Sequence, residues 1–308
     1  MNFYQLLYFS RVARTNSVSR AAEELNITQP AVSKQILALE NELGERLFDR
    51  IGKKVYLTRA GETLAARADR ILQSVQEART AVQDLSAECS GELIIGTSDH
   101  ISIHRLPDLL KAFITAYPKV DLKLRCHRSE SVLDLVENNR VDLGVITLPK
   151  ITKNVVAKTV WHDPMSLVVP AGHPLAARRT ASLKDTVAYG MILVESSTTT
   201  RKEIEDAYAE KGLAPNVTME AGYIETIKSL VKAGLGISIL PEKAVELEVR
   251  SGTLARLRLR DAELARRLGV VHLEGKYLSR PAQEFLRLLE QQARADGPGR
   301  LRKSECAD

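Results

Sequence analysis

Residues 18–34 read VSRAAEELNITQPAVSK, and this stretch decides the fold of the N-terminal part of the chain. Ser17 just before it can cap a first helix, in which the small pair Ala21-Ala22 lets another helix cross closely. Asn26-Ile27 breaks that helix, and Pro30 fits the first turn of the next one, where a missing N–H costs nothing. We therefore predict a helix, a tight turn and a second helix.

The second helix begins with polar and small side chains. Thr28 is its expected N-cap, and the residues after it offer amide, methyl, hydroxyl and ammonium groups that suit base edges and phosphates in a major groove. A polar helix start is by itself equally typical of a solvated surface. The predicted DNA contacts of this helix are Thr28, Gln29, Pro30, Ala31, Ser33 and Lys34.

Residues 47–57 read LFDRIGKKVYL, two short extended runs on either side of a break at Gly52. This pattern predicts a two-stranded wing. Arg50, Lys53 and Lys54 give the wing a positive charge that suits phosphates, although a polar turn alone would also contain such residues. Together with the preceding helix pair, the basic wing favours DNA binding. We predict a winged helix-turn-helix DNA-binding domain over residues 1–58.

Residues 59–90 are predicted to form a linker helix with an apolar position alternately every three and four residues. A lone helix with such a narrow stripe needs a partner, and the spacing is typical of a coiled coil. A dimer would place two recognition helices on a roughly two-fold symmetric double-stranded operator. The alternative is that the helix packs on its own C-terminal domain. The predicted dimerisation positions are Leu64, Ala68, Ile71, Val75, Ala78, Val82 and Leu85.

From Gly91 onward, short apolar strands alternate with amphipathic helices, which predicts an α/β domain over residues 91–295. The strand–helix order occurs twice, and we predict two lobes with a cleft between them. Lobe I comprises about residues 91–162 and 268–295, and lobe II about residues 163–267. Residues 296–308 are expected to form a flexible tail without an assigned role.

Loops rich in hydroxyl side chains follow several of these strands, at points where helix N-termini offer free N–H groups. With Arg201 nearby, they suit a small anion such as a carboxylate, phosphate or sulfate. Each hydroxyl has the alternative role of a helix cap, and Arg201 has the alternative of pairing with Glu205 one turn later. The predicted effector contacts are Ser98, Asp99, His100, Ser129, Thr147, Thr198, Thr199, Thr200, Arg201 and Tyr223.

The composition is that of a folded chain with about two domains: 308 residues, 44% hydrophobic and 27% charged. Its net charge of +5 favours a polyanionic partner only mildly. We expect a cytoplasmic protein without membrane contact, because no apolar run of about 18 residues and no signal peptide occurs. The three cysteines indicate neither disulfides nor zinc. A redox or metal role for Cys126 beside His127 is less favoured than an ordinary thiol.

An enzyme is the first competing class, but the expected motifs are missing. Residues 96–100, GTSDH, are not a nucleophile elbow, and neither a P-loop nor a dinucleotide-binding glycine pattern occurs. The six histidines lie scattered along the chain. We therefore predict no catalytic residues, no metal site and no cofactor apart from a small-molecule effector. An architectural DNA binder is the second alternative, and the two lobes argue against it.

Phe9–Gly61 resembles the DNA-binding domain of LysR-type transcriptional regulators almost motif for motif. The matching segments include residues 19–25, SRAAEEL, and residues 28–33, TQPAVS. Residues 231–241, VKAGLGISILP, are similar to the effector-domain signature of that family.

The resemblance implies a two-lobed domain like a type 2 periplasmic binding protein, a co-inducer in its cleft and a tetramer built as two dimers, with RNA polymerase as a further partner. It also implies effector contacts at Ser98, Ser129, Thr147 and Thr200. Residues 195–201 resemble the Glu-x-Gly-Ser-Gly-Thr-Arg pattern of members that regulate sulfur assimilation or carbon fixation. Because Ser197 and Thr199 replace both glycines, the subgroup stays open.

Overall fold

The computed structural model describes residues 1–51, 54–83, 88–149 and 154–295. Contacts within the chain divide it into two units, Met1–Ala87 and Glu88–Asp308. Among the described helices, none combines the length and the apolar character that a membrane crossing requires.

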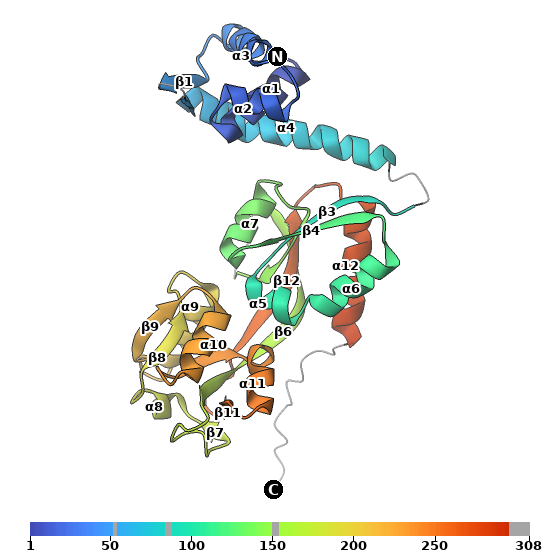
Figure 1. The fold of residues 1–308 in the computed structure, drawn as a ribbon. Coiled ribbons are helices and arrows are strands. Elements are labelled where there is room, and N and C mark those ends of the chain that lie inside the picture. Colours follow the sequence, from blue (N-terminus) through green and yellow to red (C-terminus); the bar gives the residue numbers. More distant parts are fainter. Residues whose placement is uncertain (52–53, 84–87, 150–153, 296–308) are drawn as a thin grey trace. The chain divides into compact units, whose positions relative to one another are not determined.

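The first unit contains a group of short helices, an antiparallel strand pair and a long final helix (Figure 1). The helices α1, α2 and α3 precede the pair β1–β2, in which Phe48 lies opposite Leu57. The elements are α1 Phe3–Thr15, α2 Val18–Glu24, α3 Gln29–Leu43, β1 Phe48–Ile51, β2 Lys54–Leu57 and α4 Arg59–Gln83. The predicted helix pair and the two-stranded wing are present, and residues 59–83 of the predicted linker segment 59–90 form one helix.

Local signals explain most of these helix boundaries. Ser17 caps α2, because its hydroxyl accepts a hydrogen bond from the Arg20 N–H at 3.3 Å. Pro30 lies in the first turn of α3 and Thr28 is the N-cap residue, both as predicted. Thr28 occupies the N-cap position in extended conformation, but its hydroxyl makes no capping hydrogen bond.

The core of the first unit lies where α1, α2 and α3 meet the wing. Phe9, Val32 and Leu39 are fully buried there, and the rings of Phe9 and Phe48 lie 5.2 Å apart. α4 begins against the same core at Gly61, where an added Cβ would lie 2.1 Å from the Leu47 carbonyl oxygen. Only glycine allows this close approach.

The second unit begins with a lobe built around three parallel strands in the order β4-β3-β5. Helices α6 and α12 supply Phe113 and Phe285, whose rings meet edge to face at 5.4 Å. The elements are β3 Gly91–Thr97, α5 Asp99–His104, α6 Pro107–Ala116, β4 Val120–Cys126, α7 Ser129–Glu137, β5 Leu143–Thr147 and, at the far end of the described residues, α12 Arg280–Ala295.

The second lobe combines the parallel pair β8–β9 with strands that extend the main sheet. Met191 at the start of β8 also bridges to Ile237, just before β10. The elements are β7 Thr180–Ala181, α8 Leu183–Thr186, β8 Met191–Val194, α9 Thr199–Ala209, β9 Val217–Ala221, α10 Ile224–Lys232, β10 Ser238–Pro241, the 3₁₀ turn η1 Glu242–Val245, α11 Glu246–Arg250 and β11 Leu254–Leu259.

Two long antiparallel strands, β6 Val155–Pro170 and β12 Ala265–Leu273, run from one lobe into the other (Figure 1). On β6, Trp161 belongs to the core of the first lobe and Met165 to that of the second. On β12, Leu268 packs in the first-lobe core. The sheet is therefore mixed where these strands join it, whereas the sequence pattern alone indicated a parallel layer.

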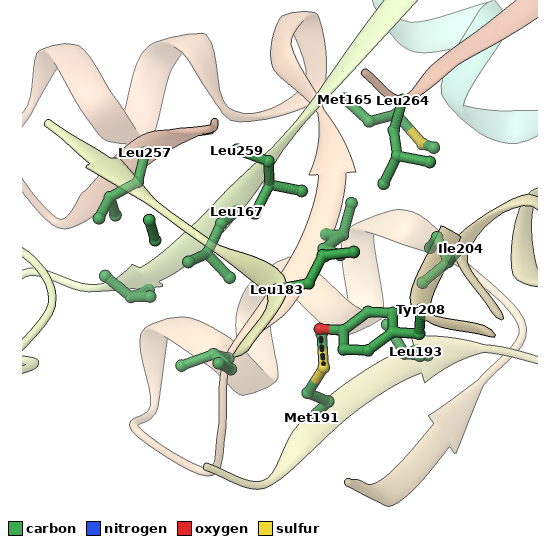
Figure 2. Close-up of a cluster of buried hydrophobic side chains, with 14 of the residues drawn as sticks. Met165, Leu167, Leu183, Met191, Leu193, Ile204, Tyr208, Leu257, Leu259 and Leu264 are labelled. Atoms are coloured by element: carbon green, nitrogen blue, oxygen red, sulfur yellow. Dashed lines mark hydrogen bonds between the residues drawn. The ribbon is translucent and has the colours of Figure 1, made fainter. Parts of the chain in front are cut away.

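The main core of the second lobe lies between α9, β8 and the end of β6, and Figure 2 shows it. Tyr208 is fully buried there. Its hydroxyl lies 2.5 Å from the Thr186 hydroxyl and 3.1 Å from the Met191 sulfur. Because the polar tip of Tyr208 is satisfied inside the core, the C-terminal turn of α9 is anchored there.

Candidate functional sites: a DNA-reading face and an effector cleft

The predicted DNA contacts lie on the outer side of α3. Val32 and Leu39 on the inner side of this helix are buried, whereas Gln29 and Lys34 are exposed and Ser33 is half-buried. Thr28, Pro30 and Ala31 are exposed at the helix start. The arrangement leaves polar groups of α3 free to meet a groove of duplex DNA.

A hollow of about 910 Å³ separates α3 from the wing, lined by Ser33 and Lys34 on one side and Asp49 on the other. Arg50 pairs with Val55 and Ile51 with Lys54 in the register of the two strands. The side chains of Arg50 and Lys54, and all of Lys53, lie outside the described residues. The predicted phosphate contacts of the wing stay predictions.

The predicted dimerisation seam divides into two parts along α4. Ala68 is fully buried in the core of the DNA-binding unit, and Leu64 packs against the same core. Farther along, Ile71, Val75 and Val82 are 43%, 39% and 69% exposed. Ala78 is exposed as well, and Leu85 lies outside the described residues. The seam is therefore not continuous: its first turns are covered by the same chain, and an apolar stripe is left uncovered beyond them.

Nine of the ten predicted effector contacts line one cavity of about 80 Å³ in the second unit. The cavity lies where the loops and helix starts that follow β3, β4 and β5 of the first lobe meet α9 and the start of α10. The nine are Ser98, Asp99, His100, Ser129, Thr147, Thr198, Thr199, Thr200 and Tyr223.

The hydroxyl groups in this cavity differ in how they are engaged. Thr198 is a helix cap, since its hydroxyl accepts from the Arg201 N–H at 3.2 Å. Ser129 accepts from the Thr147 N–H at 3.2 Å. The hydroxyls of Thr147, Thr199 and Thr200 make no hydrogen bond to any described residue. These three are available to a ligand.

Arg201 is the predicted contact that the structure does not bring into the cavity. Its side chain is 6% exposed, and Nε donates to Glu205 at 2.7 Å. The terminal nitrogen Nη1 donates to Glu220 and to the Val194 carbonyl oxygen, each at 2.9 Å. The alternative pairing with Glu205 is therefore present, and Glu220 strengthens it. Arg201 holds α9 against β8 and β9 and is not positioned as an anion ligand.

A different arginine, Arg266 of β12, lines the cavity. It is 2% exposed and donates to Asp163 at 2.5 Å and to His100 Nε2 at 2.6 Å. Arg105 donates to the other Asp163 oxygen at 2.8 Å and stacks over Trp161. The buried carboxylate of Asp163 therefore joins two buried guanidinium groups, and one positive charge is left over.

His100 is neutral in this cluster. Burial, together with the positive charges of Arg266 and Arg105, holds the pKa of His100 well below its usual value. Because Arg266 donates to Nε2, the ring proton belongs on Nδ1, which lies 3.3 Å from the Ser98 hydroxyl. The neutral ring thus accepts a hydrogen bond from Arg266 and donates one to the Ser98 hydroxyl at the rim of the cavity.

Polar contacts join the two lobes on both sides of the cavity. Arg128 of the first lobe bonds to Glu195 and, at 2.7 Å, to the Ser197 hydroxyl of the second. His104 lies 2.8 Å from Glu225. Such contacts hold the two lobes together in this arrangement.

Acidic side chains also line the cavity, and metal ligands do not cluster. Asp99 and Glu130 balance Arg128 and Arg266 in formal charge. No group of three or more His, Cys, Asp or Glu side chains that could hold a metal ion occurs within the described residues. Cys126 is exposed at the end of β4.

Sequence reasoning missed Arg266, Asp163 and Arg105. One signal was available for Arg266: strand alternation places it on the same face as the apolar Leu264 and Leu268, which indicates a buried arginine. Its partners are 103 and 166 positions away in the chain. No local pattern connects such distant residues.

Two family matches cover the chain in order. Residues 3–62 match the bacterial regulatory helix-turn-helix protein, lysR family, and residues 86–294 match the LysR substrate binding domain. The RuBisCO operon transcriptional regulator of Allochromatium vinosum is 33% identical over 91% of this chain and 93% of its own length. The regulator CfxR of Cupriavidus necator is 35% identical, with 94% and 91% covered.

Solved structures show the same fold. A full-length OxyR variant from Pseudomonas aeruginosa has a TM-score of 0.76 at 24% identity and is matched over 96% of this chain and 95% of its own. The effector binding domain of QuiR in complex with shikimate has a TM-score of 0.62 at 19% identity, over 67% of this chain and 99% of its own. With the family matches and the relatives, the conclusion is that this chain belongs to the LysR family and is a DNA-binding transcriptional regulator with a small-molecule-binding domain, not an enzyme.

Proposed function

We propose that a small anion held between the two lobes controls operator binding or transcription activation by this regulator. The observation that carries the proposal is the convergence of the free hydroxyls of Thr147, Thr199 and Thr200 with the buried Arg266 on one cavity. Hydroxyls and a guanidinium group are hydrogen-bond donors that suit a carboxylate, phosphate or sulfate.

The electrostatics of the cavity support a small anion. The Nε atom of Arg266 is buried without a hydrogen-bond partner, and α9 directs its N-terminus, with Thr199 and Thr200, at the cavity. A helix N-terminus favours negative charge. Asp99 and Glu130 line the same space and disfavour a bulky anion that would approach them.

The effect on DNA would follow from a shift in population between lobe arrangements. An anion that binds one arrangement more tightly favours it, and the inter-lobe contacts of Arg128 and His104 would change with it. We propose that α4 transmits the change to the recognition helices. The uncovered stripe on α4 supports a dimer on a roughly two-fold symmetric operator, and we extend this to a tetramer of two dimers that contacts RNA polymerase.

The test is a thermal-shift screen of the full chain against small carboxylates, phosphate and sulfate. Saturation to about 100 times Kd stabilises the native state by about 2.7 kcal/mol, which is roughly 5–10 °C for a unit of this size. Thr147→Val and Thr200→Val should each weaken binding about tenfold, because a hydrogen bond to a charged group is lost.

The matched control is Thr115→Val on α6, whose exposed hydroxyl bonds only within its own helix. It should retain the full shift. If no anion raises the midpoint, or if Thr115→Val and Thr200→Val behave alike, the anion site in the cleft is wrong. A shift with neutral or aromatic ligands would then redirect the proposal.

A further inference from the structure

A second cavity, of about 490 Å³, opens at the junction of the crossing strand β6 with η1, α11 and β11. Residues of both lobes line it: Arg105 and Trp161 come from the first, and Lys243 and Arg250 from the second. Not one of its lining residues lines the effector cleft described above. Its volume is within the range of small-molecule sites in proteins.

The lining of this junction cavity has a surplus of positive charge. Four cationic side chains face two carboxylates, a surplus of two. Both carboxylates form ion pairs with arginines of the same cavity: Glu246 with Arg250 at 2.6 Å, and Glu242 with Arg256 at 2.9 Å. Lys243 is exposed and makes no ion pair with any described residue. Arg105, Arg250 and Arg256 each have a carboxylate partner, so Lys243 supplies the positive charge that no described carboxylate balances and that attracts an anion.

Two buried donors at this cavity lack partners. The side chain of Arg105 is only 8% exposed. One of its terminal nitrogens donates a hydrogen bond to Asp163, while its Nε has no hydrogen-bond partner. The indole nitrogen of Trp161, a residue that is 4% exposed, has none either. Buried donors are nearly always satisfied in folded proteins, so two such atoms at one cavity indicate a missing acceptor.

We propose that the junction cavity is a second binding site, for a small organic anion with two or more anionic groups. Its acceptor oxygens would pair with Lys243 and Arg250 at the rim and with Arg105 at the base. The apolar surfaces of Pro164 and Val249, which also line the cavity, would contact the carbon skeleton.

The two sites are coupled through Asp163. This carboxylate binds Arg105 of the junction cavity and Arg266 of the cleft. An anion on Arg105 leaves Asp163 to Arg266 alone and adds negative charge nearby, so it should weaken anion binding in the cleft. The effect is reciprocal by linkage. The coupling rests on the anion proposed for the cleft, whereas the junction site itself does not.

Trp161 provides a direct measurement, because it is the single tryptophan of the chain and lies beneath Arg105 at 5.7 Å. The experiment titrates the full chain with citrate at constant ionic strength and follows tryptophan emission. A saturable change is expected. Lys243→Ala and Arg250→Ala should each raise the Kd about tenfold, because a charge-assisted contact is lost.

The matched control is Lys232→Ala, an exposed lysine of the same lobe that does not line the cavity. It should leave the titration unchanged. The junction site is refuted if emission does not respond to citrate, or if the Kd is equal in the wild type and in both cavity variants. A response that survives both substitutions but disappears in Thr147→Val would come from the cleft: it would overturn the second site and leave the proposed function standing.

Discussion

Replacement of Asp163 by asparagine should have opposite effects on folding and on ligand binding. The carboxylate is 1% exposed and lies between Arg105 and Arg266, whose side chains are 8% and 3% exposed. Asparagine keeps one acceptor oxygen but leaves both guanidinium groups without a counter-ion. Loss of one partner of a buried ion pair costs about 3–5 kcal/mol, and the retained acceptor places Asp163→Asn near the lower value.

A loss of about 3 kcal/mol corresponds to a fall of about 6–12 °C in the unfolding midpoint of a unit of this size. Because Trp161 belongs to the core of the first lobe, its fluorescence reports this unit and not the DNA-binding unit. Removal of the charge should also free Arg266, and the affinity of the cleft for its anion should rise roughly tenfold, equivalent to about 1.4 kcal/mol.

The assay is urea unfolding followed by tryptophan emission, combined with isothermal titration of the anion selected in the thermal-shift screen. Asp121→Asn is the control, because this exposed side chain pairs only with Lys123, at 3.2 Å. It should change neither quantity. If Asp163→Asn is as stable as Asp121→Asn, the buried charge cluster is not structural, and if the variant binds the anion more weakly, Asp163 does not compete for Arg266.

The other predictions concern pH, DNA reading and self-association. Because the pKa of His100 is lower in the folded than in the unfolded state, its contribution to stability is complete above about pH 6.5. This contribution is lost as the pH falls below that value, by up to about 1.4 kcal/mol per pH unit. His100→Gln should flatten this slope in unfolding measured from pH 7.5 to 5, and an unchanged slope would contradict the neutral state of His100. Ser33→Ala should reduce discrimination between operator and random DNA while anion binding stays intact; equal loss of both would refute the separation of the two sites. Ile71→Asp should shift sedimentation toward monomers, whereas Gln76→Asp on another face of α4 should not; identical behaviour would exclude the α4 seam.

Local patterns predicted the DNA-binding unit well because its structure depends on neighbours in the sequence. The Ser17 cap, Pro30 in the first turn of α3 and the wing are all determined within a few residues. Thr28 shows the limit: it has the right type and position for a cap, but no pattern reports the orientation of its hydroxyl. Likewise, the apolar periodicity of α4 does not show that Ala68 is buried in the core of its own DNA-binding unit and not in a dimer contact.

The cleft was predictable in part for the same reason. Strand ends and helix starts are local features, and the hydroxyls that follow them converge because parallel strands end at the same edge of a sheet. Local patterns could not show which arginine lines the cavity. Arg201 has a partner four residues away in Glu205, but the additional acceptor Glu220 and the cluster around Asp163 arise only when distant strands meet.

Control of DNA binding by a small anion in the cleft can be measured directly. The most direct test measures the affinity of the full chain for DNA selected by it from a random library, with and without the anion selected in the thermal-shift screen. We expect the anion to change operator affinity or the length of the DNase footprint in the wild type and in Thr115→Val, and to have no effect in Thr200→Val. An equal response in Thr200→Val, or no response in the wild type, would refute control of DNA binding from the cleft.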